Sequence, residues 1–218
     1  MPEQTFPLFP VVLISVGLGL LVFVVITTTA FVKVSVVLFI VRSALGIQQT
    51  PPNLVLYGIA LSLTAFIAAP VVNEVQAAVT AGPLRVDSFE DWLNALNRAR
   101  EPVREFLVMF SHPEQRTFFL SATNEIWPED MRASLNGDDL SILIPSFLVS
   151  ELQRAFQIGF LLYLPFVIID LVVTTILMAM GMSMVTPTVI SVPLKLFVFV
   201  SIDGWGLLVE GLIISYAA

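Results

Sequence analysis

Four long apolar stretches limit what this chain can fold into more than any other feature of its sequence. They cover residues 8–32, 54–72, 156–181 and 189–216. A helix that crosses a bilayer needs roughly 20 consecutive apolar residues, and each stretch approaches or exceeds that length. Only 12% of the 218 residues are charged, about half the share of a soluble domain. The sequence therefore predicts an all-α membrane protein.

Proline and glycine pair these stretches into two helical hairpins. Gly46 and the run QQTPPN at residues 48–53 separate the first two, because tandem prolines end a helix. Gly181 and Pro187 separate the last two. We expect three parts: an N-terminal apolar hairpin in residues 1–73, a polar segment in residues 74–147, and a C-terminal apolar hairpin in residues 148–218.

The polar segment holds most of the charge, with 12 acidic and 6 basic residues in positions 74–147. Residues 89–110 predict one or two amphipathic helices, interrupted near Pro102. Their apolar face consists of Trp92, Leu93, Leu96, Val103, Phe106, Leu107 and Phe110. The opposite face is acidic, which disfavours docking on a membrane surface. We expect this segment to pack a small core of its own. Charge alone leaves its side of the membrane open, since long loops cross regardless of charge.

Several functions are excluded by what the sequence lacks. It contains no cysteine, so it offers no disulfide, thiolate ligand or cysteine nucleophile. The net charge of −7 disfavours a nucleic-acid partner. The lone His112 has no metal-binding motif around it, and no G-x-S-x-G occurs. We expect no metal and no cofactor. Because the N-terminal apolar run has no basic residue before it, we interpret it as a retained membrane segment.

Charged residues within or beside the apolar stretches need an explanation, because each is expensive at membrane depth. They are Lys33, Arg42, Glu151, Arg154, Asp170, Lys195, Asp203 and Glu210. An intramembrane aspartyl protease would use Asp170 and Asp203 as its dyad, but no second motif supports one. An ion- or proton-coupled transporter acting alone would use such carboxylates as a relay, and this is the alternative function.

A structural role for these charges is the third interpretation. Glu151 and Lys195 flank the second hairpin and could neutralise each other, within one chain or between two copies. Arg154 is a competing partner for Glu151, three residues away on the same helix face. Spacing alone does not choose between these pairings.

Three long blocks resemble the SctR/FliP family of type III secretion export-apparatus proteins. They are SELQRAFQIGFLLYLPFVIIDLVVTTILMAMGM at 150–182, VPLKLFVFVSIDGWGLL at 192–208, and FVKVSVVLFIVRSALGIQQTPPNLVLYGIALSLT at 31–64. GIQQTPPN and the absence of a signal peptide look more like the injectisome branch (SctR) than the flagellar one. The resemblance implies a non-catalytic channel subunit of the export gate, in a pentameric ring with SctS-like and SctT-like subunits and other export-apparatus components.

The resemblance also implies where such a subunit works. Unfolded secreted proteins would cross the bacterial inner membrane through the pore, with the acidic segment on the periplasmic side. The apolar hairpins would assemble into a cone largely above the bilayer plane, so that they need not be ordinary lipid-facing spans. In this family Glu151 and Lys195 correspond to a contact between neighbouring subunits.

A methionine-rich turn, MAMGMSMV at 178–185, matches the pore constriction of this family. The positions that the resemblance assigns to the seal are Met182, Ser183 and Met184, and Ser183 departs from the family's usual methionine. We expect Met178 and Met180 to end the third helix and pack in a core. Met182 and Met184 are expected to project from the turn, where flexible thioethers from several copies could close a pore.

Overall fold

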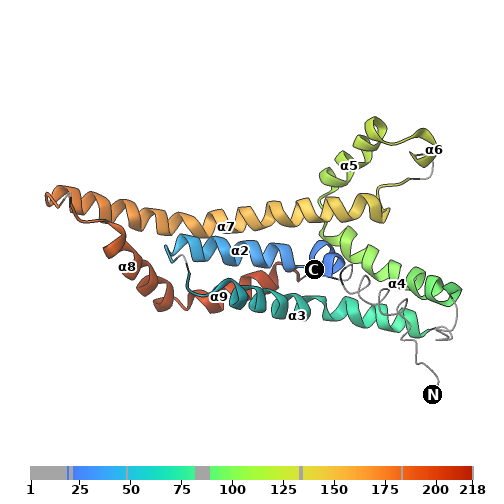
Figure 1. The fold of residues 1–218 in the computed structure, drawn as a ribbon, viewed down its shortest axis with the longest axis horizontal. Helices are drawn as coiled ribbons and strands as arrows, with labels where there is room; N and C mark the ends of the chain where they lie inside the picture. The colour runs from blue at the N-terminus through green and yellow to red at the C-terminus, as the bar shows by residue number, and fades with distance from the viewer. Residues whose placement is uncertain are drawn as a thin grey trace, which may run out of the picture.

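The chain forms an elongated bundle of helices in a computed structural model (Figure 1). The structure describes residues 19, 22–47, 49–81, 89–132, 135–182 and 184–217. A short helix, Val22–Thr28, precedes the labelled elements. These are α2 (Phe31–Ala44), α3 (Asn53–Thr80), α4 (Phe89–Phe110), α5 (Pro113–Ile126), α6 (Glu129–Arg132), α7 (Leu140–Ala179), α8 (Thr188–Ser201) and α9 (Gly204–Ile214). No strand occurs in these ranges, so the all-α prediction is confirmed.

The first hairpin is α2 and α3. The first predicted stretch, residues 8–32, lies partly outside the described residues, and the helix Val22–Thr28 at its end meets α2 at an angle of 75°. The second hairpin is α7 with α8 and α9. Helix α7 lies along α2, whereas α8 leads back from the tip of α7 to α9, which lies beside α3 (Figure 1). The main core lies between these helices and includes Val34, Leu38, Leu56 and Phe199. Helices α2 and α7 approach closely at Gly159, where an added Cβ would lie 2.4 Å from Cδ1 of Ile40.

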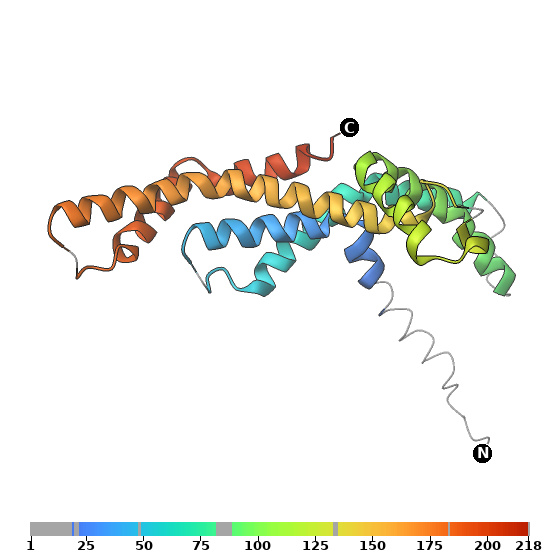
Figure 2. The same ribbon diagram turned by 90° about the horizontal axis from the view of Figure 1, so that it is seen from above.

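The polar domain, helices α4, α5 and α6, gathers at one end of the molecule (Figure 2). Its small core contains Leu107, Leu143 and Phe147. This cluster draws on residues 103–147, with Leu143 and Phe147 supplied by the first turns of α7. That the polar segment forms a domain of its own stays a prediction. Helix α4 runs through Pro102 without a break, so the predicted interruption is wrong. Leu96 is 62% exposed, whereas Leu107 is fully buried. The side chains of Trp92 and Leu93 lie outside the described residues.

Helices α3 and α7 are longer than the apolar stretches, residues 54–72 and 156–181, that predict them. Helix α7 has 40 residues, about 60 Å at 1.5 Å per residue, and its first turns belong to the polar segment. The predicted boundaries at residues 73 and 147 therefore fall inside α3 and α7. Within the described ranges, two helices could cross a membrane, or up to four if each bent pair counts as one span. A bilayer core is about 30 Å thick, so α7 is about twice as long as a span perpendicular to the membrane.

The fourth predicted stretch is divided into two helices. Helices α8 and α9 meet at an angle of 62°. Asp203, between them, has a φ of 52°, in the left-handed region, which L-residues enter at a cost of about 1–2 kcal/mol. The run SIDGWG therefore breaks the helix that hydropathy alone predicts as continuous.

Candidate functional site: the methionine turn and the buried charges

The methionine turn lies at the tip of the molecule, at the end of α7 farthest from the polar domain (Figure 1). Gly181, with a φ of 73°, ends the helix. Its N–H donates to the carbonyl of Met178 at 3.0 Å, and the N–H of Met182 donates to that of Leu177 at 2.9 Å. This pair of bonds is the Schellman motif, which needs a left-handed residue and so favours glycine. The sequence thus fixes where the turn begins.

All four methionines of the turn are exposed in the single chain. Met182 is 40% and Met184 98% exposed, as expected for side chains that project from a turn. Met178 and Met180 are 67% and 66% exposed. The prediction that these two pack in the core of the chain is therefore wrong, because α8 diverges from α7 at the tip and no described segment covers them. Ser183, the third predicted seal residue, lies outside the described residues.

A buried charge cluster lies near the other end of α7, where it faces α2. Lys33 and Glu151 are both fully buried, with Nζ of Lys33 3.3 Å from Oε2 of Glu151. Arg154 donates from Nη1 to Oε1 of Glu151 at 2.9 Å and to the carbonyl of Phe110 at 2.7 Å. The hydroxyl of Tyr216 also donates to Glu151. One carboxylate therefore accepts contacts from α2, α7 and the segment after α9.

A second ion pair joins α7 to α8. Nζ of Lys195 donates to Oδ2 of Asp170 at 2.5 Å and to the carbonyl of Ala44, at the end of α2, at 3.0 Å. The Lys195 side chain is 6% exposed and that of Asp170 44%. Of the pairings left open by the sequence, Glu151 with Arg154 is present. Glu151 and Lys195 are each paired elsewhere within the chain, and their pairing between copies stays a prediction.

The two aspartates considered for a protease dyad have different surroundings. Asp170 is paired with Lys195, whereas Asp203 is exposed at the break between α8 and α9. A dyad requires two carboxylates that share one proton in a common site. An ammonium already neutralises Asp170, so the geometry gives no support to acid–base chemistry. Among the described residues, no three His, Cys, Asp or Glu side chains lie close enough to hold a metal ion.

Sequence reasoning missed the partner of Lys33, and it missed Tyr216 altogether. Lys33 was recognisable as a costly charge in an apolar run, but its partner lies 118 positions later in the sequence. Tyr216 carries no signal, because a tyrosine near the end of an apolar stretch is compatible with many environments. Only the fold shows that both contact Glu151.

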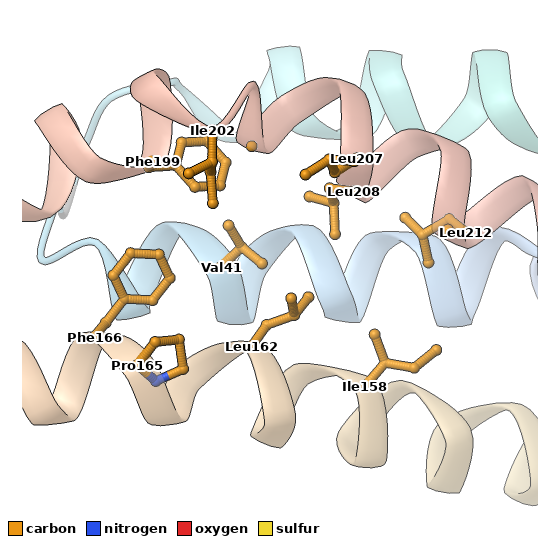
Figure 3. Close-up of a pocket in the computed structure, with 12 residues that line it drawn as sticks. Val41, Ile158, Leu162, Pro165, Phe166, Phe199, Ile202, Leu207, Leu208 and Leu212 are labelled. Atoms are coloured by element: carbon orange, nitrogen blue, oxygen red, sulfur yellow. The ribbon is translucent and has the colours of Figure 1, made fainter.

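Much of the apolar surface has no cover within the described part of the chain. Exposed side chains on α7 include Phe156, Phe160, Leu161, Ile168, Leu171 and Ile176, each more than half exposed. An apolar pocket of about 340 Å³ opens between α2, α7 and the α8–α9 break (Figure 3). Leu162 and Phe166 line it from one side, and Phe199 and Leu208 from the other. Patches this extensive mark contact with lipid or with other protein chains.

Comparison with known proteins identifies relatives along nearly the whole chain. Residues 13–212 match the FliP family. The probable translocation protein y4yL of Sinorhizobium fredii is 58% identical over 216 residues, 99% of this chain and 97% of that relative. The Yop proteins translocation protein R of Yersinia pestis is 44% identical, over 91% of this chain and 92% of the relative. The virulence protein YscR of Salmonella typhimurium is 42% identical, over 92% of this chain and 93% of that relative.

Proposed function

This chain belongs to the FliP family, in the injectisome (SctR) branch, and on that premise we propose that it forms the channel of a type III secretion export gate. It is a multi-pass inner-membrane component of the export apparatus, and it is not an enzyme. In the proposal, several copies form a ring, pentameric by resemblance to the family. SctS-like and SctT-like subunits complete the complex, and unfolded proteins cross the membrane through its centre.

One observation carries the proposal: α7 extends without interruption from the polar domain to a tip of exposed methionines. A single chain gains nothing by exposing Met182 and Met184 to water. A ring of copies would bring these tips together, and unbranched thioethers could close an irregular opening and still yield to a passing chain. The seal residues in the proposal are Met182, Ser183 and Met184.

The uncovered apolar face of α7 supports assembly. Its exposed side chains need protein or lipid contacts, and a helix of about 60 Å extends beyond the roughly 30 Å of a bilayer core. Neighbouring subunits would cover the part outside the bilayer. The polar domain, at the opposite end from the seal, would then lie on the periplasmic side.

Permeability of assembled complexes tests the seal. The double variant Met182→Ala, Met184→Ala is expected to raise small-molecule leakage while the complex still assembles, because the shorter side chains leave an opening. The matched control is Met109→Ala, Met131→Ala, since these methionines of the polar domain are 59% and 54% exposed but distant from the tip. Unchanged leakage in an assembled double variant, or equal leakage in the control, would contradict the proposal.

A further inference from the structure

We infer that Tyr216 is a latch residue, which holds the polar domain against the apolar hairpins at the buried Lys33–Glu151 pair. Tyr216 packs against the main core. Its ring also lies 4.9 Å from that of Phe110 and 6.5 Å from that of Phe106, measured between centroids. Both phenylalanines belong to the separate core of the polar domain. One aromatic side chain therefore bridges the two cores of the molecule.

The electrostatics of the cluster make this ring more than a packing contact. Nζ of Lys33 has no hydrogen bond among the described residues, although it is fully buried. It is held by the charge of Glu151 and by the face of the Tyr216 ring, whose centroid lies 3.4 Å from Nζ. Cation–π attraction is strongest for a desolvated ammonium such as this one. The hydroxyl of the same tyrosine donates to Glu151, so Tyr216 contacts both members of the ion pair.

Two hydrogen bonds between the end of α4 and α7 lie beside the same cluster. Arg154 joins Glu151 to the carbonyl of Phe110, the last residue of α4. The N–H of His112 donates to Oγ of Ser150 at 2.9 Å. These bonds fix the backbone at the end of α4. Tyr216 adds ring contacts over its last turns to those that Phe106 makes with Phe147 of α7. Loss of the Tyr216 ring should therefore loosen the end of α4 and leave the α2–α3 hairpin packed.

Thiol labelling of the assembled complex tests the latch, because the natural chain has no cysteine. Two single-cysteine probes are used: Ser111→Cys, 4% exposed just after α4, and Ala60→Cys, fully buried in α3. Each is combined with Tyr216→Ala, and in parallel with Tyr163→Ala as a control. Tyr163, on α7, is 40% exposed and has no part in the cluster. The rate of maleimide modification reports how often each probe opens to solvent.

With Tyr216→Ala, modification of the Ser111→Cys probe is expected to become about tenfold faster or more. The Ala60→Cys probe should keep its rate, and Tyr163→Ala should change neither. No acceleration at Ser111→Cys would overturn the inference, and so would equal acceleration at both probes, which would indicate general loosening.

If Tyr216→Ala does not accumulate, Tyr216→Phe replaces it, with an expected acceleration of about threefold from loss of the hydroxyl alone. No change there would also overturn the inference. The result is independent of whether the methionines seal a pore.

Discussion

At the scale of single residues, the partners of Glu151 and Lys195 decide whether the buried charges stabilise the single chain or the contact between copies. Within the chain, Glu151 already faces Lys33 and Arg154, and Lys195 already holds Asp170. Reversing the charge of Glu151 would place three cations in one buried cluster. It would thus disrupt the fold whatever Lys195 contacts in a neighbouring copy, because an uncompensated buried charge costs several kcal/mol. Substitutions that remove a charge without reversing it distinguish better between the ion pairs within the chain and the predicted pair between copies.

We predict that Lys195→Gln lowers the yield of assembled complex by about tenfold, equivalent to roughly 1.4 kcal/mol. It would remove both the internal pair and the proposed contact with Glu151 of a neighbouring copy. Asp170→Asn breaks only the internal pair and leaves the buried Lys195 ammonium with the carbonyl of Ala44, so it should lower the thermal stability. Because it keeps the contact between copies, it should lower the yield of complex from folded protein less than Lys195→Gln does. Native mass measurement of the purified complex gives both yields, with thermal stability as the control for folding. Equal losses for the two variants would count against the pair between copies.

The sequence indicated which charged residues matter but not how they pair. Glu151 and Arg154 are three residues apart on α7, and this local spacing correctly suggested their contact. The contacts of Lys33 with Glu151 and of Lys195 with Asp170 join different helices. They depend on which faces of α2, α7 and α8 meet, which a sequence without its fold does not give.

At the scale of helices, close packing of α2 on α7 depends on Gly159. A Cβ at this position would lie 2.4 Å from Cδ1 and 3.2 Å from Cβ of Ile40, so the Ile40 side chain would have to shift. Overpacking of this kind costs typically about 1–3 kcal/mol. Gly58, within α3, serves as its counterpart, because a methyl group added there would have nothing within 4 Å among the described residues.

We predict opposite signs for the same substitution at these two glycines. Gly159→Ala should lower the thermal unfolding midpoint, because the clash outweighs the gain in helix propensity. Gly58→Ala should leave the midpoint unchanged or raise it, since alanine is favoured over glycine in a helix by up to about 1 kcal/mol. Unfolding of the two purified variants in the same detergent measures this difference. A stabilised Gly159→Ala variant would refute the close approach of α2 and α7.

Hydropathy and turn residues predicted most of the helices. The glycines that end α2 and α7 both have positive φ, as the turn signals suggested. The same signals did not predict the length of α7, because its first turns contain Ser146 and Ser150 and merge with the polar segment. The break at Asp203 was also missed, since aspartate in the left-handed region carries no clear sequence signal beyond the glycines beside it.

At the scale of the whole molecule, α7 places the polar domain and the methionine turn at opposite ends (Figure 1). The extensive exposed apolar surface on α7 and α8 is consistent with a subunit that is completed by its neighbours. A transporter acting alone has no need for an exposed methionine tip. The central claim is therefore geometric: copies of the chain converge at this turn.

Cross-linking at the tip tests that claim most directly. With Met184→Cys as the only cysteine in the chain, mild oxidation of the assembled complex is expected to join neighbouring copies by disulfides, because the tips converge. Met131→Cys, in the polar domain, is the control and should give no such product. Disulfide-linked dimers at position 184 alone are the result that this account predicts. Intact complexes in which Met184→Cys remains monomeric would contradict it.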